Sequence, residues 1–320
     1  MNLPTLDELR RATELIRTVM PATPTYTWPL LNARAGVEVW LKHENHSPVG
    51  AFKLRGATVY MDWLAREHPD VTEVVAATRG NHGQGVALAA SRKGWTATIV
   101  VPFGNSREKN RAMQALGATL IEHGDDFQAA NEYATELAKQ RGAHKVMSFH
   151  RLLVEGTGTY ALEMFESAPE LDAVYVPVGM GSSICGVAAA REALGLKTKI
   201  IGVVTRNAPA YALSFAAGHA VNHDVVSTIA DGLACRAPED DAVEAIVKHV
   251  ERFVLVDDHQ IAAAMRAIYE DTHNVAEGAG AAAVAAVLAD PDPVRGKRVG
   301  AVLTGGNVDR EIFVQALGTA

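Results

Sequence analysis

Cysteine is scarce in this chain of 320 residues, since only Cys185 and Cys235 occur. Two cysteines are too few for a disulfide framework, and their spacing fits no common zinc site. No stretch reaches about 18 uninterrupted apolar residues, and the N-terminus has no apolar core of signal-peptide length. We therefore expect a cytoplasmic protein that does not associate with a membrane.

A basic excess is also missing. The chain has 30 Lys and Arg residues against 37 Asp and Glu residues, and it contains no arginine-rich run. A nucleic-acid partner is therefore not expected, because the chain has no excess of basic side chains that could neutralise phosphates. A hydrophobic content of 48% and a charged content of 21% indicate a folded protein, and the length predicts about two domains.

Strand-like and helix-like segments alternate along the chain. A capping box at residues 5–8 opens the first helix, and prolines then predict an extended path over 21–29. Alternation at this pitch predicts parallel sheets with helices on both faces, which is an α/β fold. Strands are predicted at 37–41, 73–77, 96–101, 119–121, 145–149, 173–177, 199–204, 253–256 and 298–303. Helices are predicted at 5–20, 56–67, 83–93, 106–116, 126–141, 155–166, 184–194, 240–250, 258–270 and 280–288. Segment 205–224 is predicted to be less regular, and 290–293 to form a turn.

Lys53 is the first candidate for chemistry. It lies between Phe52 and Leu54 in the segment Gly50–Ala57 (GAFKLRGA). A lysine flanked by apolar residues is ordinarily a surface side chain whose stem covers apolar neighbours. Here three glycine-bearing loops accompany it, which favours a lysine that binds a cofactor as a Schiff base.

One of these loops, Gly179–Ser183 (GMGSS), follows a predicted strand and precedes a predicted helix. Backbone N–H groups and the positive end of the helix dipole would face the same point, and Ser182 and Ser183 could add hydroxyl donors. The arrangement suits an anion, although a tight turn without any ligand would also need glycine. The dinucleotide pattern is absent, because Ile184 stands where its third glycine is required.

A second loop, Thr78–Gly85 (TRGNHGQG), occupies the same kind of position. Successive backbone donors at a helix start suit a carboxylate. Asn81 adds an amide that could bond a phenolate-like oxygen, and His82 adds another donor. A lone loop histidine is usually structural, but the density of glycine and polar residues after an apolar strand favours ligand contact.

These segments together resemble the fold-type II pyridoxal-phosphate enzymes, and most closely the threonine/serine dehydratases. Gly50–Ala57 resembles their lysine motif, Gly80–Gly85 their substrate-carboxylate loop and Val176–Gly186 their phosphate loop. The segments 230–234, 277–281 and 304–309 resemble, in order, their later cofactor-contacting segments. The similarity covers nearly the whole chain.

The resemblance implies a two-lobed α/β fold in which each lobe is a mostly parallel sheet flanked by helices. A large cofactor-binding domain would comprise 1–53 and 150–320, and a small substrate-closing domain 54–149. A homodimer is the family expectation. The implied cofactor is pyridoxal 5'-phosphate, with Lys53 as the catalytic residue. The implied cofactor contacts are Phe52, Lys53, Asn81, Gly179, Met180, Gly181, Ser182, Ser183, Gly232, Glu277 and Thr304. The implied substrate contacts are Thr78, Arg79, Gly80, Asn81 and His82.

The implied activity is that of an ammonia-lyase. It would remove water from an L-β-hydroxy amino acid of the threonine, serine, phenylserine or hydroxyaspartate type and release a 2-oxo acid and ammonia. Two alternatives stay open. One is another β-elimination or β-replacement on the same scaffold, as in hydroxyectoine breakdown. The other is a catalytically silent member that binds a ligand.

Departures from the family pattern are informative. Arg79 replaces the usual serine, which serves as an acid/base in related racemases, and a guanidinium is never a free base at neutral pH. This argues against racemase activity. Arg79 could bind a carboxylate or a polar β-substituent, or it could pair with an acid outside the site. Val204 and Ala210 replace the carboxylates of a divalent-cation site, so no metal is predicted there. The variants at 51–53, 78–83 and 148–151 resemble those of phenylserine and hydroxyectoine dehydratases.

Overall fold

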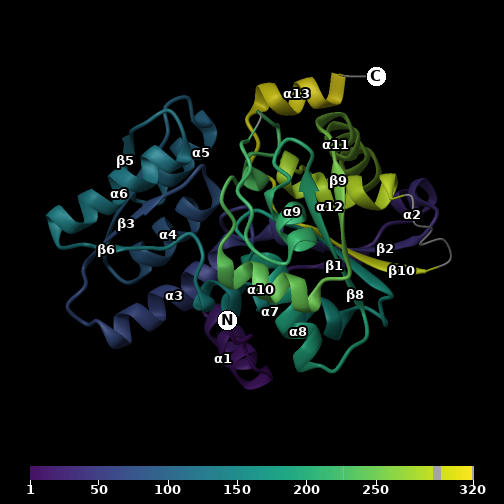
Figure 1. Cartoon of the computed structure of the whole chain (residues 1–320), viewed down its shortest axis with the longest axis horizontal. Coiled ribbons are helices and arrows are strands. Elements are labelled where there is room, and N and C mark those ends of the chain that lie inside the picture. The colour runs from purple at the N-terminus through teal and green to yellow at the C-terminus, as the bar shows by residue number, and fades with distance from the viewer. Residues whose placement is uncertain (226, 291–296, 319–320) are drawn as a thin grey trace.

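The computed structural model describes residues 1–225, 227–290 and 297–318 (Figure 1). The predicted turn at 290–293 falls largely outside these residues. Within the described ranges no helix has the length and apolar character needed to cross a membrane. The elements form two groups in Figure 1, each built around one sheet.

The six-stranded sheet has the order β1-β2-β10-β7-β8-β9. All neighbouring strands are parallel except the short edge pair β1–β2, which is antiparallel. Its strands are β1 (Thr25–Thr27), β2 (Glu38–His43), β7 (Ala173–Pro177), β8 (Lys199–Thr205), β9 (Arg252–Val256) and β10 (Arg298–Leu303).

The four-stranded sheet has the order β5-β4-β3-β6 and is entirely parallel. Its strands are β3 (Glu73–Ala77), β4 (Thr96–Val101), β5 (Thr119–Glu122) and β6 (His144–Lys145). Both sheets confirm the predicted two-lobed α/β class with mostly parallel strands. The exact domain boundaries stay a prediction.

Helices flank both sheets. They are α1 (Leu6–Arg17), α2 (Pro29–Ala35), α3 (Lys53–Glu67), α4 (Asn81–Arg92), α5 (Arg107–Ala115), α6 (Phe127–Arg141), α7 (Arg151–Ser167), α8 (Ser182–Ala193), α9 (Ala210–Ala217), α10 (Asp240–His249), α11 (Asp258–Thr272), α12 (Gly278–Ala289) and α13 (Arg310–Gly318). Short 3₁₀ turns lie at Glu44–His46 (η1) and Asp231–Leu233 (η2).

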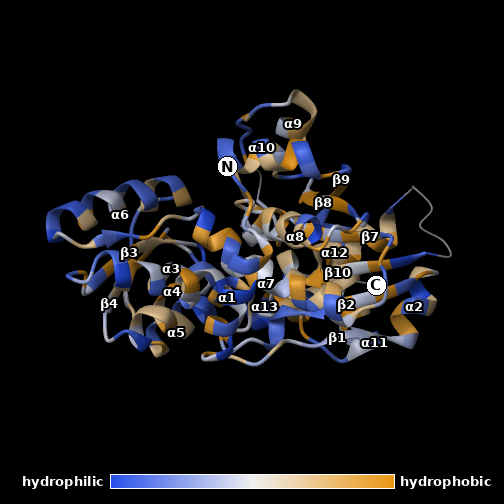
Figure 2. Ribbon diagram, turned by 90° about the horizontal axis from the view of Figure 1, so that it is seen from below, coloured by the Kyte–Doolittle hydropathy of each residue, from blue (hydrophilic) through white to orange (hydrophobic). Residues whose placement is uncertain are grey.

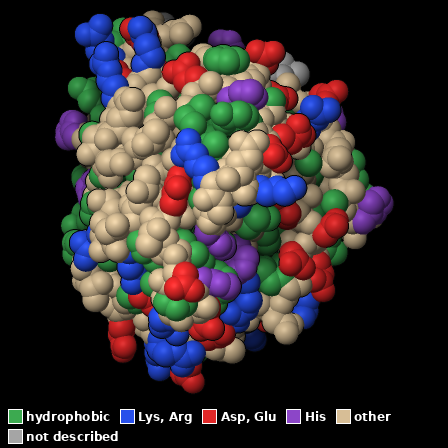
Figure 3. Space-filling model, turned by 90° about the vertical axis from the view of Figure 1, so that its left-hand side faces the viewer, with side chains coloured by type: hydrophobic (Ala, Val, Ile, Leu, Met, Phe, Trp, Pro, Cys, Tyr) green, Lys and Arg blue, Asp and Glu red, His purple; other side chains and the backbone are tan. Residues whose placement is uncertain are grey.

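The hydropathy of a helix depends on whether it is buried or lies on the outside of the molecule (Figure 2). Helix α12 is buried from Gly278 to Val287, which explains why it is apolar all round instead of amphipathic. Outer helices such as α6 are largely hydrophilic. Figure 3 shows acidic and basic side chains interspersed over the face that includes the four-stranded sheet.

The predicted extended path over 21–29 is confirmed as far as residue 28 and includes β1, but Pro29 is the first residue of α2, where a missing N–H costs nothing. Two other local predictions were wrong. The segment 205–224 contains α9. The strand predicted at 145–149 ends at Lys145, because the chain turns there and brings Ser148 to the pocket described below.

A buried ion cluster connects β2 and η1 with the helices α3 and α7. Arg55 on α3 has no exposed side-chain surface, and its guanidinium donates to Glu44 at 2.8 Å and to Glu163 of α7 at 2.8 and 2.9 Å. Thr159 and Thr23 accept further bonds at 3.0 and 3.1 Å, and Lys42 donates to Glu163 at 2.7 Å. Although burial alone would raise the pKa of Glu163, Arg55 and Lys42 lower it to about 2.

We predict that Arg55→Met lowers the free energy of unfolding by about 3–5 kcal/mol, because two buried carboxylates lose their shared partner. Urea denaturation would measure the change. The matched control is Arg107→Met, whose ion pair with Glu311 has both side chains more than 60% exposed and whose loss should cost at most about 1 kcal/mol. Equal effects of the two substitutions would contradict this assignment.

Candidate active site

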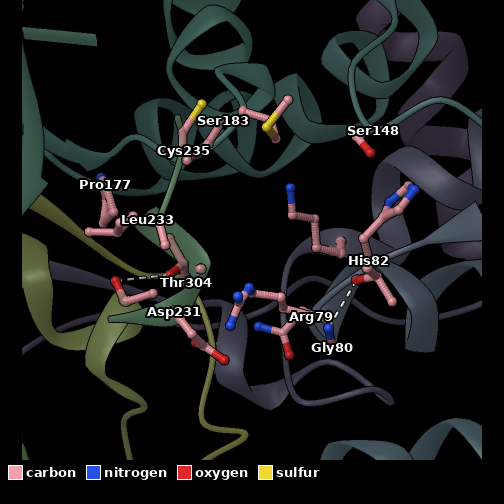
Figure 4. Close-up of a pocket in the computed structure, with 18 of the residues that line it drawn as sticks. Arg79, Gly80, His82, Ser148, Pro177, Ser183, Asp231, Leu233, Cys235 and Thr304 are labelled. Atoms are coloured by element: carbon pink, nitrogen blue, oxygen red, sulfur yellow. Dashed lines mark hydrogen bonds between the residues drawn. The ribbon is translucent and has the colours of Figure 1, made fainter. Parts of the chain in front are cut away.

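A pocket with an empty volume of about 930 Å³ opens where strands of both sheets end (Figure 4). β3 ends at Ala77, β7 at Pro177 and β10 at Leu303, and the residues that follow each strand line the pocket. The carboxyl ends of parallel strands commonly form ligand sites, because loops and helix N-termini converge there.

Every predicted site residue lines this pocket. They are Phe52, Lys53, Thr78, Arg79, Gly80, Asn81, His82, Gly179, Met180, Gly181, Ser182, Ser183, Gly232, Glu277 and Thr304. The fold thus brings together residues that are up to about 250 positions apart in sequence.

Lys53 is the first residue of α3, and its loop is tied to the loop after β10. The N–H of Phe52 donates to the carbonyl of Thr304 at 3.0 Å, and the N–H of Gly306 donates to the carbonyl of Gly50 at 2.9 Å. The Lys53 Nζ lies 4.7 Å from the centre of the Phe52 ring. Burial lowers the pKa of Lys53 to about 8, against a weaker opposing effect of Glu277. The amine is therefore positioned firmly and is easy to deprotonate.

The glycine loop between β7 and α8 forms a cradle of backbone. Gly181 has a φ of 95°, a left-handed conformation that favours glycine, and a Cβ at Gly179 would collide with the carbonyl oxygen of Gly232. Helix α8 begins directly after this turn, so its free N–H groups face the pocket.

Two tyrosines hold this cradle from behind. The Tyr211 hydroxyl donates to the carbonyl of Met180 at 2.9 Å, and the hydroxyls of Tyr160 and Ser183 are 2.6 Å apart. Neither tyrosine lies in a motif that the sequence analysis identifies, and Tyr211 belongs to α9, which was not predicted.

The loop between β3 and α4 is equally constrained. The N–H of Gly80 donates to Thr78 Oγ1 at 2.9 Å. The Asn81 amide donates to Glu277 at 2.5 Å and accepts from Asn307 at 2.9 Å. His82 is buried, and burial followed by the charges of Lys53 and Lys145 lowers its pKa to about 3. His82 is therefore neutral near pH 7, and its Nε2 has no hydrogen-bond partner among the described residues.

Lys109 is a functional candidate that sequence reasoning missed. It reaches from α5 to Asp231 at 2.7 Å and to Glu277 at 2.9 Å. Burial acts to lower its pKa, but the two carboxylates outweigh burial and raise it. Nothing in the helical spacing of α5 marked this lysine. The other unpredicted lining residues are Ala77, Phe127, Ser148, Pro177, Asp231, Leu233, Ala234, Cys235 and Ala279.

The pocket residues fit pyridoxal phosphate. The group needs an amine that is readily deprotonated, which Lys53 supplies, and an anion cradle, which the backbone at Gly179–Ser183 supplies. Among the described residues, no cluster of three or more His, Cys, Asp or Glu side chains is arranged to hold a metal ion.

Comparisons with known proteins agree with this fit. The family described as "Pyridoxal-phosphate dependent enzyme" matches residues 16–305. The L-threonine ammonia-lyase of Thermotoga maritima is 39% identical over 306 residues, which cover 95% of this chain and 76% of that protein. The chain spans only 56% of the bacterial biosynthetic L-threonine dehydratases of Haemophilus influenzae and Escherichia coli.

Comparison with solved structures supports the same family. Threonine deaminase isoform 2 of Solanum lycopersicum superposes with a TM-score of 0.89 at 31% identity, covering 99% of this chain and 95% of that one. Maize serine racemase superposes with a TM-score of 0.92 at 29% identity, covering 99% and 97%. The chain therefore belongs to the pyridoxal-phosphate-dependent enzymes of fold-type II.

Proposed function

We propose that this protein is an ammonia-lyase that removes water from an L-β-hydroxy amino acid and releases a 2-oxo acid and ammonia. One observation carries the proposal: Lys53, a desolvated lysine whose pKa is about 8, shares a pocket with a backbone anion cradle. The names of the relatives, threonine ammonia-lyase and threonine deaminase, support the same reaction.

The predicted cofactor contacts all line the pocket, which supports the roles that we propose for them. Lys53 would bind pyridoxal phosphate covalently, with Phe52, Asn81, Gly232, Glu277 and Thr304 around the ring and Gly179–Ser183 at the phosphate. When bound, the cofactor supplies an electron sink for the pair that the α-carbon retains on losing its proton. The protein's task is to orient the substrate and to move protons.

Lys53 is the proposed general base. Once its amine is free, a pKa of about 8 leaves a substantial neutral fraction near physiological pH, and a neutral amine can accept the α-proton at Nζ. An ordinary lysine with a pKa near 10.4 would be almost fully protonated there.

The loop Thr78–His82 is the proposed site for the substrate α-carboxylate. Its backbone donors lie at the start of α4, where the helix dipole favours an anion. His82 is neutral, so it can donate a hydrogen bond without adding a charge. The unpartnered Nε2 indicates a place that a ligand could fill.

Lys109 is a positioning residue in this proposal. Its two ion pairs connect α5, beside the four-stranded sheet, with η2 and α12, beside the six-stranded sheet. Glu277 in turn accepts from Asn81. The network fixes the side chains on either side of the pocket relative to each other.

Racemase activity is not part of the proposal. The likeness to serine racemase is one of fold, and fold alone does not settle the reaction. Arg79 cannot act as the second base that a racemase needs, because a guanidinium offers N–H donors and no acceptor. The division into domains 1–53 with 150–320 and 54–149, the homodimer and the cytoplasmic location also remain part of what we propose.

We predict that Lys53→Ala abolishes both the visible absorption of the lysine-bound cofactor and 2-oxo acid release. The rate should fall by roughly 10²- to 10⁴-fold or more, because covalent attachment and proton removal are both lost. The assay would measure 2-oxo acid from L-threonine, L-serine, L-threo-phenylserine and L-threo-3-hydroxyaspartate. Lys145→Ala is the control, since Lys145 also has a pKa of about 8 but does not line the pocket. A colourless wild-type protein would contradict the proposed function.

A second prediction concerns pH. Only the neutral Lys53 amine can capture the cofactor aldehyde, so the capture rate of the apoprotein should rise about tenfold per pH unit at low pH and level off above about pH 8. Stopped-flow absorption would follow the reaction. Nα-acetyl-lysine, whose amine titrates near 10.4, is the reference compound. A capture rate that keeps rising to pH 10 would show that burial does not lower the Lys53 pKa.

A further inference from the structure

Arg79 is a charged pocket residue whose place in the proposed chemistry is not yet explained. Within the described part of the chain, no carboxylate forms an ion pair with its guanidinium, and no hydrogen bond to it is found. The sequence left open whether Arg79 pairs with an acid outside the site. The described residues offer no such acid, so the explanation must lie inside the pocket.

The carboxylates in the pocket are already engaged. Asp231 accepts a hydrogen bond from Lys109 at 2.7 Å, and Glu277 forms an ion pair with Lys109 at 2.9 Å. Glu277 also accepts a hydrogen bond from Asn81. Lys109 thus balances the acidic side chains of the pocket. Lys53 is assigned to the cofactor. Among the described residues, no carboxylate forms an ion pair with Arg79, so its positive charge is not compensated in this way.

The place of Arg79 separates it from the proposed phosphate cradle. It lies between β3 and α4, at the start of the proposed carboxylate loop, and its side chain projects into the pocket (Figure 4). In that view it lies on the side of Asp231 and Gly80, whereas Ser183 of the cradle lies across the pocket. The backbone of residues 80–82 already offers donors for an α-carboxylate, so Arg79 is available for another group on the substrate.

A guanidinium has five N–H donors and binds carboxylates in a bidentate manner. A methyl or phenyl β-substituent would leave these donors without a partner when the substrate fills the pocket, which is unfavourable. A cationic substituent would be repelled. Of the substituents on a β-hydroxy amino acid, a carboxylate matches the guanidinium in both charge and geometry.

We propose that Arg79 binds a second carboxylate of the substrate, so that the preferred substrate class is the β-hydroxy amino dicarboxylic acids, with 3-hydroxyaspartate as the smallest member. This inference rests on the proposed function and specifies its substrate. The reaction breaks the α C–H and β C–O bonds and forms a carbon–carbon double bond, with loss of water. The resulting enamine takes up one water and releases ammonia. The product is a 2-oxo dicarboxylic acid, and no oxidant or reductant is needed.

The decisive experiment compares two substrates on the same variants. For the wild-type holoenzyme, kcat/KM should be higher with threo-3-hydroxyaspartate than with L-threonine. Arg79→Gln should lower kcat/KM for hydroxyaspartate roughly 10- to 100-fold, the effect of losing a charge-assisted hydrogen-bond pair, and change that for threonine far less. Arg79→Lys should fall in between, since it keeps the charge but loses the bidentate geometry.

Binding without turnover gives an independent measurement. Succinate has two carboxylates and butyrate only one, so succinate should inhibit the wild-type holoenzyme competitively at lower concentration than butyrate. This difference should vanish in Arg79→Gln. Arg111→Gln is the matched control, because Arg111 is on α5 and does not line the pocket.

Four outcomes would overturn the inference. An equal loss with both substrates would place Arg79 at the α-carboxylate, and a loss of bound cofactor in Arg79→Gln would place it at the phosphate. Turnover of threonine or phenylserine in preference to hydroxyaspartate, with an unchanged ratio in Arg79→Gln, would refute the dicarboxylate specificity while leaving the lyase intact. A cofactor-loaded protein that is inert with every substrate would refute the lyase as well.

Discussion

The guanidinium of Arg55 holds the centre of this molecule together. It is buried against Glu44 and Glu163, so a residue that follows β2 and a residue in α7 both depend on one side chain of α3. Charges are costly to bury unless they are paired and fully hydrogen-bonded, and here each oxygen of both carboxylates has a donor. Lys53 begins the same helix two residues earlier. The ion cluster therefore anchors the first turn of the helix that carries the reactive amine.

The pocket is built on a similar principle, but its charges do not cancel. Lys109 is balanced by Asp231 and Glu277, which makes it part of the framework. Lys53 and Arg79 have no such partners in the described structure. A cation that the protein leaves unbalanced in a pocket creates a local field that attracts anions. In this site Lys53, whose amine is readily deprotonated, is assigned to the cofactor, and the guanidinium of Arg79 is assigned to the substrate.

The backbone also shapes the pocket. The cradle at Gly179–Ser183 depends on close contact with Gly232 and on support from Tyr211 and Tyr160, which lie outside the loop itself. The fold is shared with a threonine deaminase and with a serine racemase. What distinguishes members is therefore the set of side chains that the same backbone presents, and in the present chain Arg79 is the one to which we assign the choice of substrate.

The sequence by itself determined the family, the α/β class and many of the residues that line the pocket, because these depend on local signals. Glycine-rich turns between an apolar strand and a helix, and a lysine in an apolar segment, are visible in a few consecutive residues. It could not determine the partners of Arg55, the support of the loop by Tyr211, or the contact of Lys109 with two carboxylates more than 100 residues away. Nor could it show that Arg79 has no acidic partner among the described residues. Charge pairing across the chain depends on which helices and loops pack together, and only the tertiary structure decided that.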